Sequence, residues 1–327
     1  MKLSVLDVLP VPSGTQPRQV LARAQDLAQV ADRLGYERIW YAEHHGMASI
    51  AATSPDLLIA HTAPLTERIR LGAGGVMIPN HAPLQVVERY RTLEALHPGR
   101  IDLGIGRAPG TDPLTSKALR AVPGQYTGEL IAELMAFGHG GFPDDHPFGR
   151  IGVVPGGTSM PPVWMLGSSG GSAEMAGGLG TGYAFAAHFS PTPAAPAIQA
   201  YRDAFVPSDD FPEPRVILAL SVVCAETAEE ARELSSTIEI HFQRIASREP
   251  RGPVPSPEEA RALGWSPDVP LQGPMAGLLI AGTPETVRSE IESRAAAVEA
   301  DEVMIMTIVH DHAARLRSYE LLGSEIA

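Results

Sequence analysis

Short apolar runs alternate with longer amphipathic stretches along most of the chain. Eight runs have the pattern of buried strands: LSVLDVL, ERIWYAEHH, IRLGAGGVM, RIDLGIGR, PPVWMLG, GYAFAAH, VILALSVVCA and DEVMIMTIV. Between them lie stretches with helical spacing, such as Val20, Leu27 and Leu34 on one face. Strands that alternate with helices in this way indicate a parallel sheet with crossover helices. We therefore predict an α/β fold, a (β/α)8 TIM barrel, with a doubly wound open sheet as the alternative.

Two segments exceed the length of a minimal barrel. The first, about 108–161, has a helix-compatible centre at 128–137, and the second, 248–280, contains seven prolines that preclude one long helix. Both lie where a barrel places the loops of its active-site face. We expect residues 1–327 to form a single barrel domain in which 248–280 is a mobile lid.

Charge and cysteine content narrow the classes of function. The chain has 25 Lys and Arg residues against 38 Asp and Glu residues, a net charge of −13, which argues against a nucleic-acid or anionic-membrane surface. Cys224 is the only cysteine, so no internal disulfide or multi-cysteine metal site can form, and its apolar strand pattern is typical of a core residue. The N-terminal sequence lacks a signal-peptide pattern, and no apolar stretch reaches about 18 residues, so we expect a cytoplasmic location.

Glu43, His44 and His45 lie at the expected C-terminal end of the second strand, where barrel enzymes place catalytic groups. Strand alternation predicts that Glu43 and His45 point one way and His44 the other. A histidine here could act as general acid or base near neutral pH, or it could belong to a buried hydrogen-bonded pair. The spacing of a zinc motif is absent, so we predict no metal site.

Arg107 ends the fourth predicted strand. In GIGRAPG the third glycine stands one place too late for a dinucleotide fingerprint, which makes a Rossmann motif improbable. An arginine at a strand end is placed to bind an anion through its fixed fork of donors. The alternative is a surface ion pair with a carboxylate such as Asp112.

The segment SSGGS follows the fifth predicted strand and precedes a helix that we expect from Ser172. Ser169 and Ser172 supply hydroxyl groups, while Gly170 and Gly171 leave backbone N–H groups accessible near the helix N-terminus. Together with Arg107, this pattern predicts a site for the phosphate monoester of a cofactor or sugar.

The glycine-rich segment 72–75 ends the third predicted strand. Its lack of side chains permits either the close approach of a flat ligand or a β-bulge, and the segment alone does not favour one of them.

In combination, the EHH, GGVMIPNHAP and RIDLGIGRAPGTD segments resemble the bacterial luciferase-like flavin-dependent monooxygenases, in particular the single-subunit members. The resemblance runs from the first strand to about residue 190 and resumes in the last helices. It implies a (β/α)8 barrel that binds FMN, in which reduced flavin and O2 give a flavin C4a-hydroperoxide that oxygenates a small organic substrate. Relatives of this subgroup occur in secondary metabolism, which suggests a secondary metabolite.

The resemblance also assigns roles to individual residues. His44 matches the active-site histidine, Arg107 the phosphate-binding arginine, and Ser169 and Ser172 the two phosphate-binding hydroxyl residues. A cis peptide bond without proline is expected beneath the flavin ring at Gly74–Gly75. Luciferase itself has a reactive cysteine where this chain has Gly106, which predicts more room beside the ring.

Other activities and partners follow from the same comparison. One alternative keeps the fold but uses the deazaflavin F420 for hydride transfer, and another is a catalytically silent flavin-binding protein. A phosphate-binding barrel lyase is disfavoured, since no lysine stands at a strand end for a Schiff base.

No nicotinamide fingerprint is present, so reduced FMN would come from a separate flavin reductase. The family pairs barrels through helices near strands two to four, which predicts a homodimer.

Overall fold

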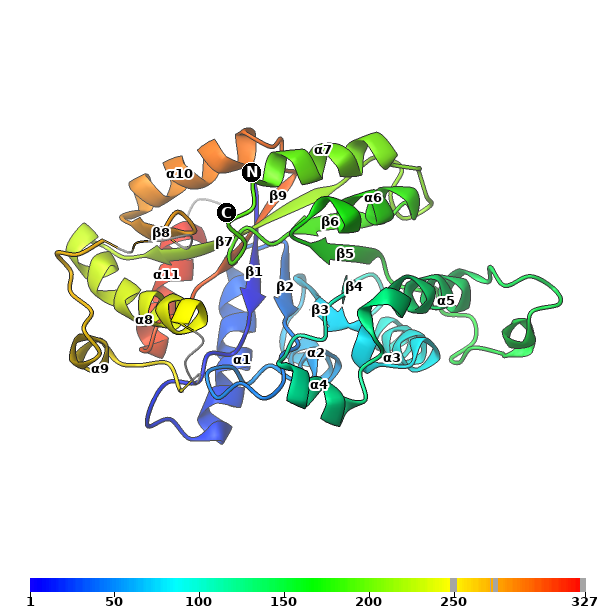
Figure 1. The fold of residues 1–327 in the computed structure, drawn as a ribbon, viewed down its shortest axis with the longest axis horizontal. Helices are drawn as coiled ribbons and strands as arrows, with labels where there is room; N and C mark the ends of the chain where they lie inside the picture. The colour runs from blue at the N-terminus through cyan, green and yellow to red at the C-terminus, as the bar shows by residue number, and fades with distance from the viewer. Residues whose placement is uncertain (248–251, 271, 273–275, 324–327) are drawn as a thin grey trace.

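The chain folds into a closed parallel barrel surrounded by helices (Figure 1). The computed structural model describes residues 1–247, 252–270, 272 and 276–323. Strand β1 pairs with β2 and β9, the order continues through β6, and β6 and β9 both pair with β7, which closes the ring. The strands of the described residues are β1 (Lys2–Asp7), β2 (Arg38–Tyr41), β3 (Arg70–Met77), β4 (Ile101–Gly106), β5 (Val163–Gly167), β6 (Gly182–Phe185), β7 (Val216–Cys224), β8 (Leu279–Gly282) and β9 (Glu302–Met306). The predicted (β/α)8 barrel is confirmed.

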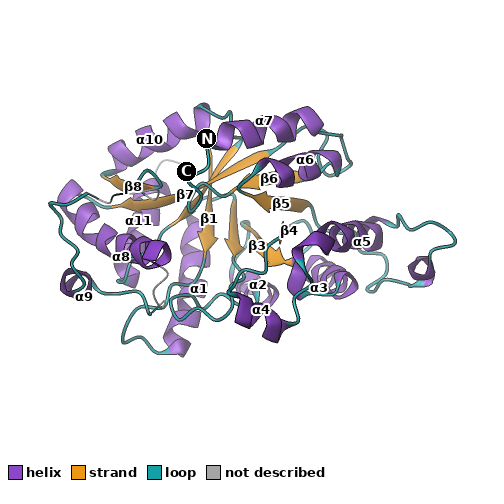
Figure 2. Ribbon diagram, in the orientation of Figure 1, coloured by secondary structure: helices purple, strands orange, loops and turns teal. Residues whose placement is uncertain are grey.

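Helices cover the outside of the strands (Figure 2). Within the described ranges they are α1 (Pro17–Arg33), α2 (Pro55–Thr62), α3 (Pro83–Leu96), α4 (Pro113–Leu119), α5 (Thr127–His139), α6 (Gly170–Gly178), α7 (Ala194–Ala204), α8 (Ala228–Ser247), α9 (Pro257–Ala262), α10 (Pro284–Ala296) and α11 (His312–Gly323). Proline occupies the first position of six of them, where its missing N–H breaks no helical bond. On α1 the predicted apolar face is buried, with Val20 and Leu27 in the core.

The ninth strand was not predicted. Strand β8 lies at the end of the 248–280 segment and pairs with the last residues of β7, whereas β9 pairs with the preceding part of β7. Strand β7 is thus long enough to pair both with a strand of the closed ring and with an additional edge strand. Four residues of mixed burial carry little strand signal, which is why the sequence pattern missed β8.

Both predicted insertions contain ordered elements. The first includes α4 and α5, and α5 confirms the helix expected at 128–137. The second includes α9, and its residues 248–251, 271 and 273–275 lie outside the described residues, so its predicted mobility stays a prediction. A small apolar cluster of Ile240, Ala260 and Trp265 holds α9 against α8, and Trp265 donates a hydrogen bond to Glu239 at 2.9 Å.

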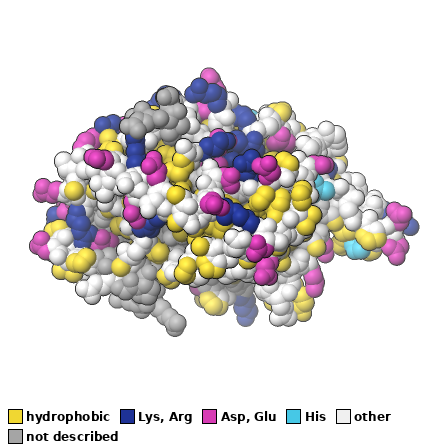
Figure 3. Space-filling view, turned by 90° about the horizontal axis from the view of Figure 1, so that it is seen from above, with side chains coloured by type: hydrophobic (Ala, Val, Ile, Leu, Met, Phe, Trp, Pro, Cys, Tyr) yellow, Lys and Arg dark blue, Asp and Glu magenta, His cyan; other side chains and the backbone are white. Residues whose placement is uncertain are grey.

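The face at which β1 begins has mixed charge. Seen from this side, Lys and Arg side chains lie among Asp and Glu side chains (Figure 3). Anion binding on a chain with a net charge of −13 therefore depends on individual side chains placed by the fold.

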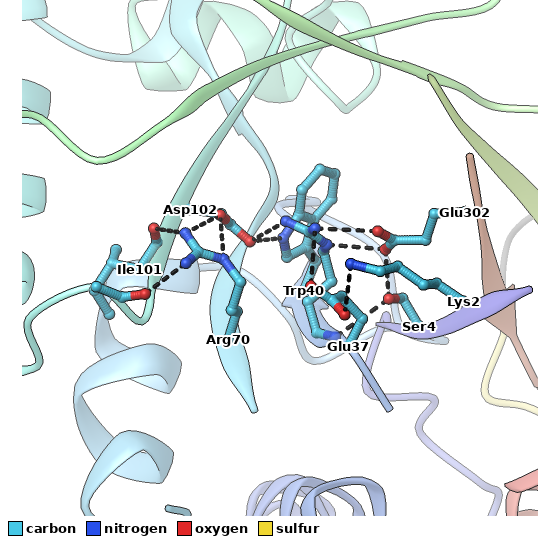
Figure 4. A network of polar contacts seen from close by, with 10 residues as sticks. Lys2, Ser4, Glu37, Trp40, Arg70, Ile101, Asp102 and Glu302 are labelled. Atoms are coloured by element: carbon cyan, nitrogen blue, oxygen red, sulfur yellow. Dashed lines mark hydrogen bonds and ion pairs between the residues drawn. The ribbon is translucent and has the colours of Figure 1, made fainter. Parts of the chain in front are cut away.

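A buried polar network closes the barrel near the N-terminal ends of the strands (Figure 4). Arg38 donates to Asp102 at 2.7 Å and to Glu302 at 2.8 Å, and Arg70 donates to Asp102 at 2.6 Å. Trp40 adds an indole N–H bond to Asp102 at 3.1 Å. Burial opposes ionisation of Asp102, but the two arginines outweigh it and lower its pKa. Asp102 is therefore structural, and it lies at the end of the barrel opposite the expected active site.

Cys224 lies in the core at the end of β7. Its side chain is buried and its pKa is raised to about 11 by burial. A neutral buried thiol is a small core residue, which confirms the prediction.

Candidate active site

Glu43 joins the loops that follow β2 and β3. Its buried carboxylate accepts hydrogen bonds from the Met77 backbone N–H at 3.0 Å and the Asn80 side chain at 3.1 Å. The Nε2 atoms of His45 and His81 each lie 2.9 Å from the same carboxylate. Burial opposes its ionisation, but His81 and its other partners prevail and lower the pKa. Glu43 thus stays ionised and fixes this part of the barrel mouth.

The strand predicted to include the EHH motif is shorter than expected. Strand β2 ends at Tyr41, since the chain leaves the sheet so that Glu43 can reach the end of β3. The prediction that Glu43 and His45 point the same way is confirmed, because the two side chains are in contact. His45 therefore takes the structural alternative, while His44 is left facing elsewhere.

His44 has a second histidine for a neighbour. His188, which follows β6, lies close enough to His44 for a charge on His44 to lower the pKa of His188. Both side chains are partly buried. Burial lowers the pKa of His188 to about 3, with His44 acting in the same direction and a hydrogen bond to the Ala219 backbone opposing it. His188 is thus neutral at physiological pH. The sequence reading missed His188, although its place after the strand GYAFAAH was a signal of the same kind as that of His44.

The end of β3 has the predicted unusual backbone. The Gly74–Gly75 peptide bond is cis, and the pairing of β3 with β4 shifts register between Ala73 and Val76. The β-bulge expected for the glycine segment is confirmed, and the close approach of a flat ligand stays a prediction. A methyl group on Gly75 would lie 2.8 Å from the Gly104 carbonyl oxygen, so no side chain fits there without a shift.

The space beside Gly106 is already filled. A methyl group on Gly106 would lie 2.7 Å from both the sulfur and the terminal methyl of Met77. The expectation of more room at this position is therefore wrong, because the flexible thioether of Met77 occupies it.

Arg107 lies next to the start of α6. A methyl group on Gly171 would be 3.8 Å from a terminal nitrogen of Arg107. Asp112, the alternative partner, instead caps α4 by accepting from the backbone N–H groups of Leu114 and Thr115. Among the described residues Arg107 has no ion pair, so its guanidinium is available for an anion.

Helix α6 presents free backbone donors toward Arg107. It begins at Gly170, two residues before the expected start, because Ser169 is extended and serves as the N-cap. The Ser169 side chain is exposed and makes no capping bond, and Gly170 and Gly171 carry no side chains that would cover their N–H groups. Helix N-termini with accessible N–H groups favour anions. The structure thus brings Arg107, Ser169, Gly170 and Gly171 together.

Ser172 has a different environment from Ser169. It is buried, and its hydroxyl donates to the Ser169 carbonyl at 2.9 Å. The hydroxyl of Tyr183, on β6, lies 3.4 Å from the same carbonyl. Tyr183 is buried, and burial raises its pKa. Sequence reasoning did not find Tyr183, since a tyrosine inside a strand looks like an ordinary core residue.

The described part of the second insertion reaches the barrel mouth. Val254 exchanges backbone hydrogen bonds with the loop after β1, through Val11 and Ser13. The Ser13 hydroxyl also contacts Glu259 of α9 and lies 3.2 Å from Nε2 of His310, after β9. This part of the insertion therefore lies beside the loops after β1 and β9.

The described residues contain neither a cluster of metal-binding side chains nor a membrane-spanning helix. No group of three or more His, Cys, Asp or Glu side chains there is arranged to hold a metal ion. In the same part of the chain, no helix has both the length and the apolar character needed to span a membrane.

Solved structures at low sequence identity share the fold. The oxygenating constituent of 3,6-diketocamphane monooxygenase from Pseudomonas putida, in complex with FMN, aligns with a TM-score of 0.75 at 21% identity, covering 100% of this chain and 98% of that one. An F420-dependent secondary alcohol dehydrogenase, in complex with an F420–acetone adduct, aligns with a TM-score of 0.67 at 15% identity, covering 98% and 97%.

Closer matches define the family. The family model for luciferase-like monooxygenases matches residues 1–300. A luciferase-like monooxygenase of Escherichia coli strain K12 is 37% identical over 325 residues, covering 97% of this chain and 95% of that protein. The crystal structure of apo-MsnO8 aligns with a TM-score of 0.88 at 38% identity, covering 99% of this chain and 96% of that one. The chain therefore belongs to the luciferase-like monooxygenase family.

Proposed function

We propose that the protein is a monooxygenase that uses reduced FMN and O2 to oxygenate a small organic substrate, such as a secondary metabolite. The observation that carries the proposal is the position of Arg107. Its guanidinium lies beside the N-terminus of α6 and has no carboxylate partner among the described residues. A phosphate monoester, the terminal group of FMN, has the charge and the acceptors that this arrangement lacks.

The residues at the mouth fit the rest of FMN as well. The backbone of Gly74–Gly75 offers a surface without side chains for the flat ring. Arg107, the Ser169 hydroxyl and the N–H groups of Gly170 and Gly171 bind the phosphate, and Ser172 joins them if its hydroxyl turns from the Ser169 carbonyl.

His44 and His188 have different roles in proton transfer. His44 donates or accepts a proton at a nitrogen of its imidazole ring. His188 beside it is neutral, so it adds no second positive charge near His44. Bound reduced FMN would supply the electrons with which O2 is activated for oxygen transfer. Residues 252–270, whose Val254 bonds to the loop after β1, act as a lid that keeps water from the reacting groups.

Similarity to solved structures supports FMN as the cofactor. The FMN-bound monooxygenase structure is more similar to this chain than the F420-bound dehydrogenase in both identity and TM-score, which supports FMN. F420 remains the alternative cofactor, because a phosphate site alone accepts either.

Partners follow from the same proposal. A separate flavin reductase supplies reduced FMN. A second copy of the chain packs against α2 and α3, where Leu57 and Leu96 are 67% and 64% exposed beside a groove of about 630 Å³ that Val154 also lines. Light scattering on the purified protein should then give the mass of a dimer.

The decisive experiment compares FMN with riboflavin, which differs from it only in the phosphate, and with the alternative cofactor F420. Anaerobic titration with reduced FMN, reduced riboflavin and reduced F420 should show tightest binding for FMN. Arg107→Ala should weaken FMN binding about tenfold or more and leave riboflavin binding unchanged, because a lost charge-assisted hydrogen bond costs roughly 1.5–3 kcal/mol. Arg18→Ala, at an exposed arginine of α1, is the control.

A second measurement tests the chemistry. With air admitted, substrate oxygenation by His44→Ala should fall by roughly 10²-fold or more at saturating reduced FMN. Equal FMN affinity in wild type and Arg107→Ala would refute the phosphate assignment. Unchanged oxygenation in His44→Ala would refute the role of that histidine.

A further inference from the structure

The Ser169 carbonyl has two hydroxyl donors within reach. The Ser172 hydroxyl donates to it at 2.9 Å and the Tyr183 hydroxyl at 3.4 Å. Both hydroxyls converge over Gly167, where an added methyl group would lie 3.1 Å from the Tyr183 oxygen and would overlap the Ser172 hydroxyl. A carbonyl oxygen can accept from both hydroxyls, so the Ser169 carbonyl keeps one donor if the other hydroxyl turns away.

The Ser172 hydroxyl has only one proton to donate. While that proton is given to the Ser169 carbonyl, Ser172 cannot donate it to a phosphate. Ser172 is nevertheless the third residue of α6, in the first turn that faces Arg107 across Gly171. Turning its hydroxyl toward an anion would leave the carbonyl without its better donor.

We propose that Tyr183 is a positioning residue for the phosphate site. Its hydroxyl replaces the Ser172 hydroxyl as hydrogen-bond donor to the Ser169 carbonyl, and the Ser172 hydroxyl is then free to donate to the phosphate. This inference rests on the proposed binding of FMN. Tyr183 is suited to the task because it is buried on a barrel strand and its ring stacks on Tyr201 at 5.3 Å, which leaves its hydroxyl little freedom.

The proposal predicts a coupling between two hydroxyl groups. Tyr183→Phe keeps the ring and removes the donor, so Ser172 stays engaged with the carbonyl and the phosphate loses a hydrogen bond. The preference for reduced FMN over reduced riboflavin should then fall about tenfold, the size of one hydrogen bond to a charged group. Ser172→Ala should cause a similar loss, and the double variant should lose no more than either single variant.

Tyr201→Phe is a matched control. It also removes the hydroxyl of a buried tyrosine, one that donates to the Thr181 carbonyl at 2.9 Å and accepts from the Arg215 N–H at 3.0 Å. It has no contact with the Ser169 carbonyl, so it should leave the FMN-to-riboflavin ratio unchanged even if it lowers stability. Calorimetric titration of each folded variant with both reduced flavins gives the ratios.

The outcomes separate the two levels of inference. A wild-type protein that binds both flavins equally refutes the phosphate site, and this inference with it. If the wild type prefers FMN but Tyr183→Phe keeps that preference, or if the two substitutions act additively, the phosphate site stands and the role of Tyr183 is refuted. Should Tyr183→Phe fail to fold, retention of the wild-type ratio by Ser172→Ala would refute the role instead.

Discussion

At the scale of single residues, immediate partners decide which histidine is structural and which is available for chemistry. His45 and His81 both contact the Glu43 carboxylate and so belong to the scaffold that joins two loops. His44 and His188 lie near each other instead, in a place where one positive charge disfavours another. Strand alternation in the sequence was enough to separate His44 from His45, but only the closed barrel places His188 beside His44.

His188 should make folding sensitive to acid. Its pKa is about 3 in the folded protein, because of burial and the neighbouring His44, and about 6.5 when unfolded. Between these values the unfolded chain binds a proton that the folded chain does not, so stability falls as the pH falls. In urea unfolding, moving from about pH 7.5 to about pH 5 should cost the wild type roughly 2 kcal/mol more than it costs His188→Gln.

A histidine on the surface provides the comparison for this measurement. His139→Gln, at an exposed position on α5, should keep the acid sensitivity of the wild type. Equal acid sensitivity in the wild type and His188→Gln would contradict a His188 that is neutral in the folded protein.

At the scale of elements, the sequence predicted what depends on local pattern and missed what depends on contacts between elements. Arg107 and the α6 glycines were found because barrel strands end at the active-site face. Tyr183 was missed because its contact with Ser169 joins β6 to the start of α6, and no periodicity encodes that distance. The room expected at Gly106 was wrong for a similar reason, since Met77 reaches it from another strand.

The junction between β5 and α6 should tolerate no side chain at Gly167. A methyl group there would lie 2.6 Å from Cβ of Ser172 and 3.1 Å from the Tyr183 hydroxyl. Gly167→Ala should therefore move the first turn of α6, weaken FMN binding about tenfold and lower stability by about 1–3 kcal/mol. Titration with reduced FMN and urea unfolding would measure both effects.

The same helix contains a glycine where a methyl group meets nothing. Gly178 has no atom within 4 Å of an added methyl group, so Gly178→Ala should leave FMN binding unchanged and stabilise the protein by about 0.5 kcal/mol or more. If Gly167→Ala bound FMN as tightly as Gly178→Ala, the packing around Ser172 would not control the phosphate site.

At the scale of the whole molecule, the residues that stabilise the barrel and those proposed to bind FMN lie at opposite ends of its axis. The ionic network around Asp102 and Glu302 (Figure 4) lies near the N-terminal ends of the strands, where Arg38 pairs with both carboxylates. Arg107 and His44 follow the C-terminal ends of β4 and β2. In this chain of net charge −13, arginines thus have two different roles. Arg38 is neutralised by buried carboxylates, whereas Arg107 has no ion pair among the described residues.

Asp102→Asn tests that separation. The change removes a buried negative charge and leaves Arg38 and Arg70 without one of their partners, which should lower the free energy of unfolding by about 3–5 kcal/mol. Glu290→Gln, in the exposed pair with Arg294, should cost less than about 1 kcal/mol. Because the network lies away from the phosphate site, folded Asp102→Asn should bind reduced FMN with wild-type affinity. A loss of FMN affinity in that variant at temperatures where it is folded would show that the two ends of the barrel are coupled.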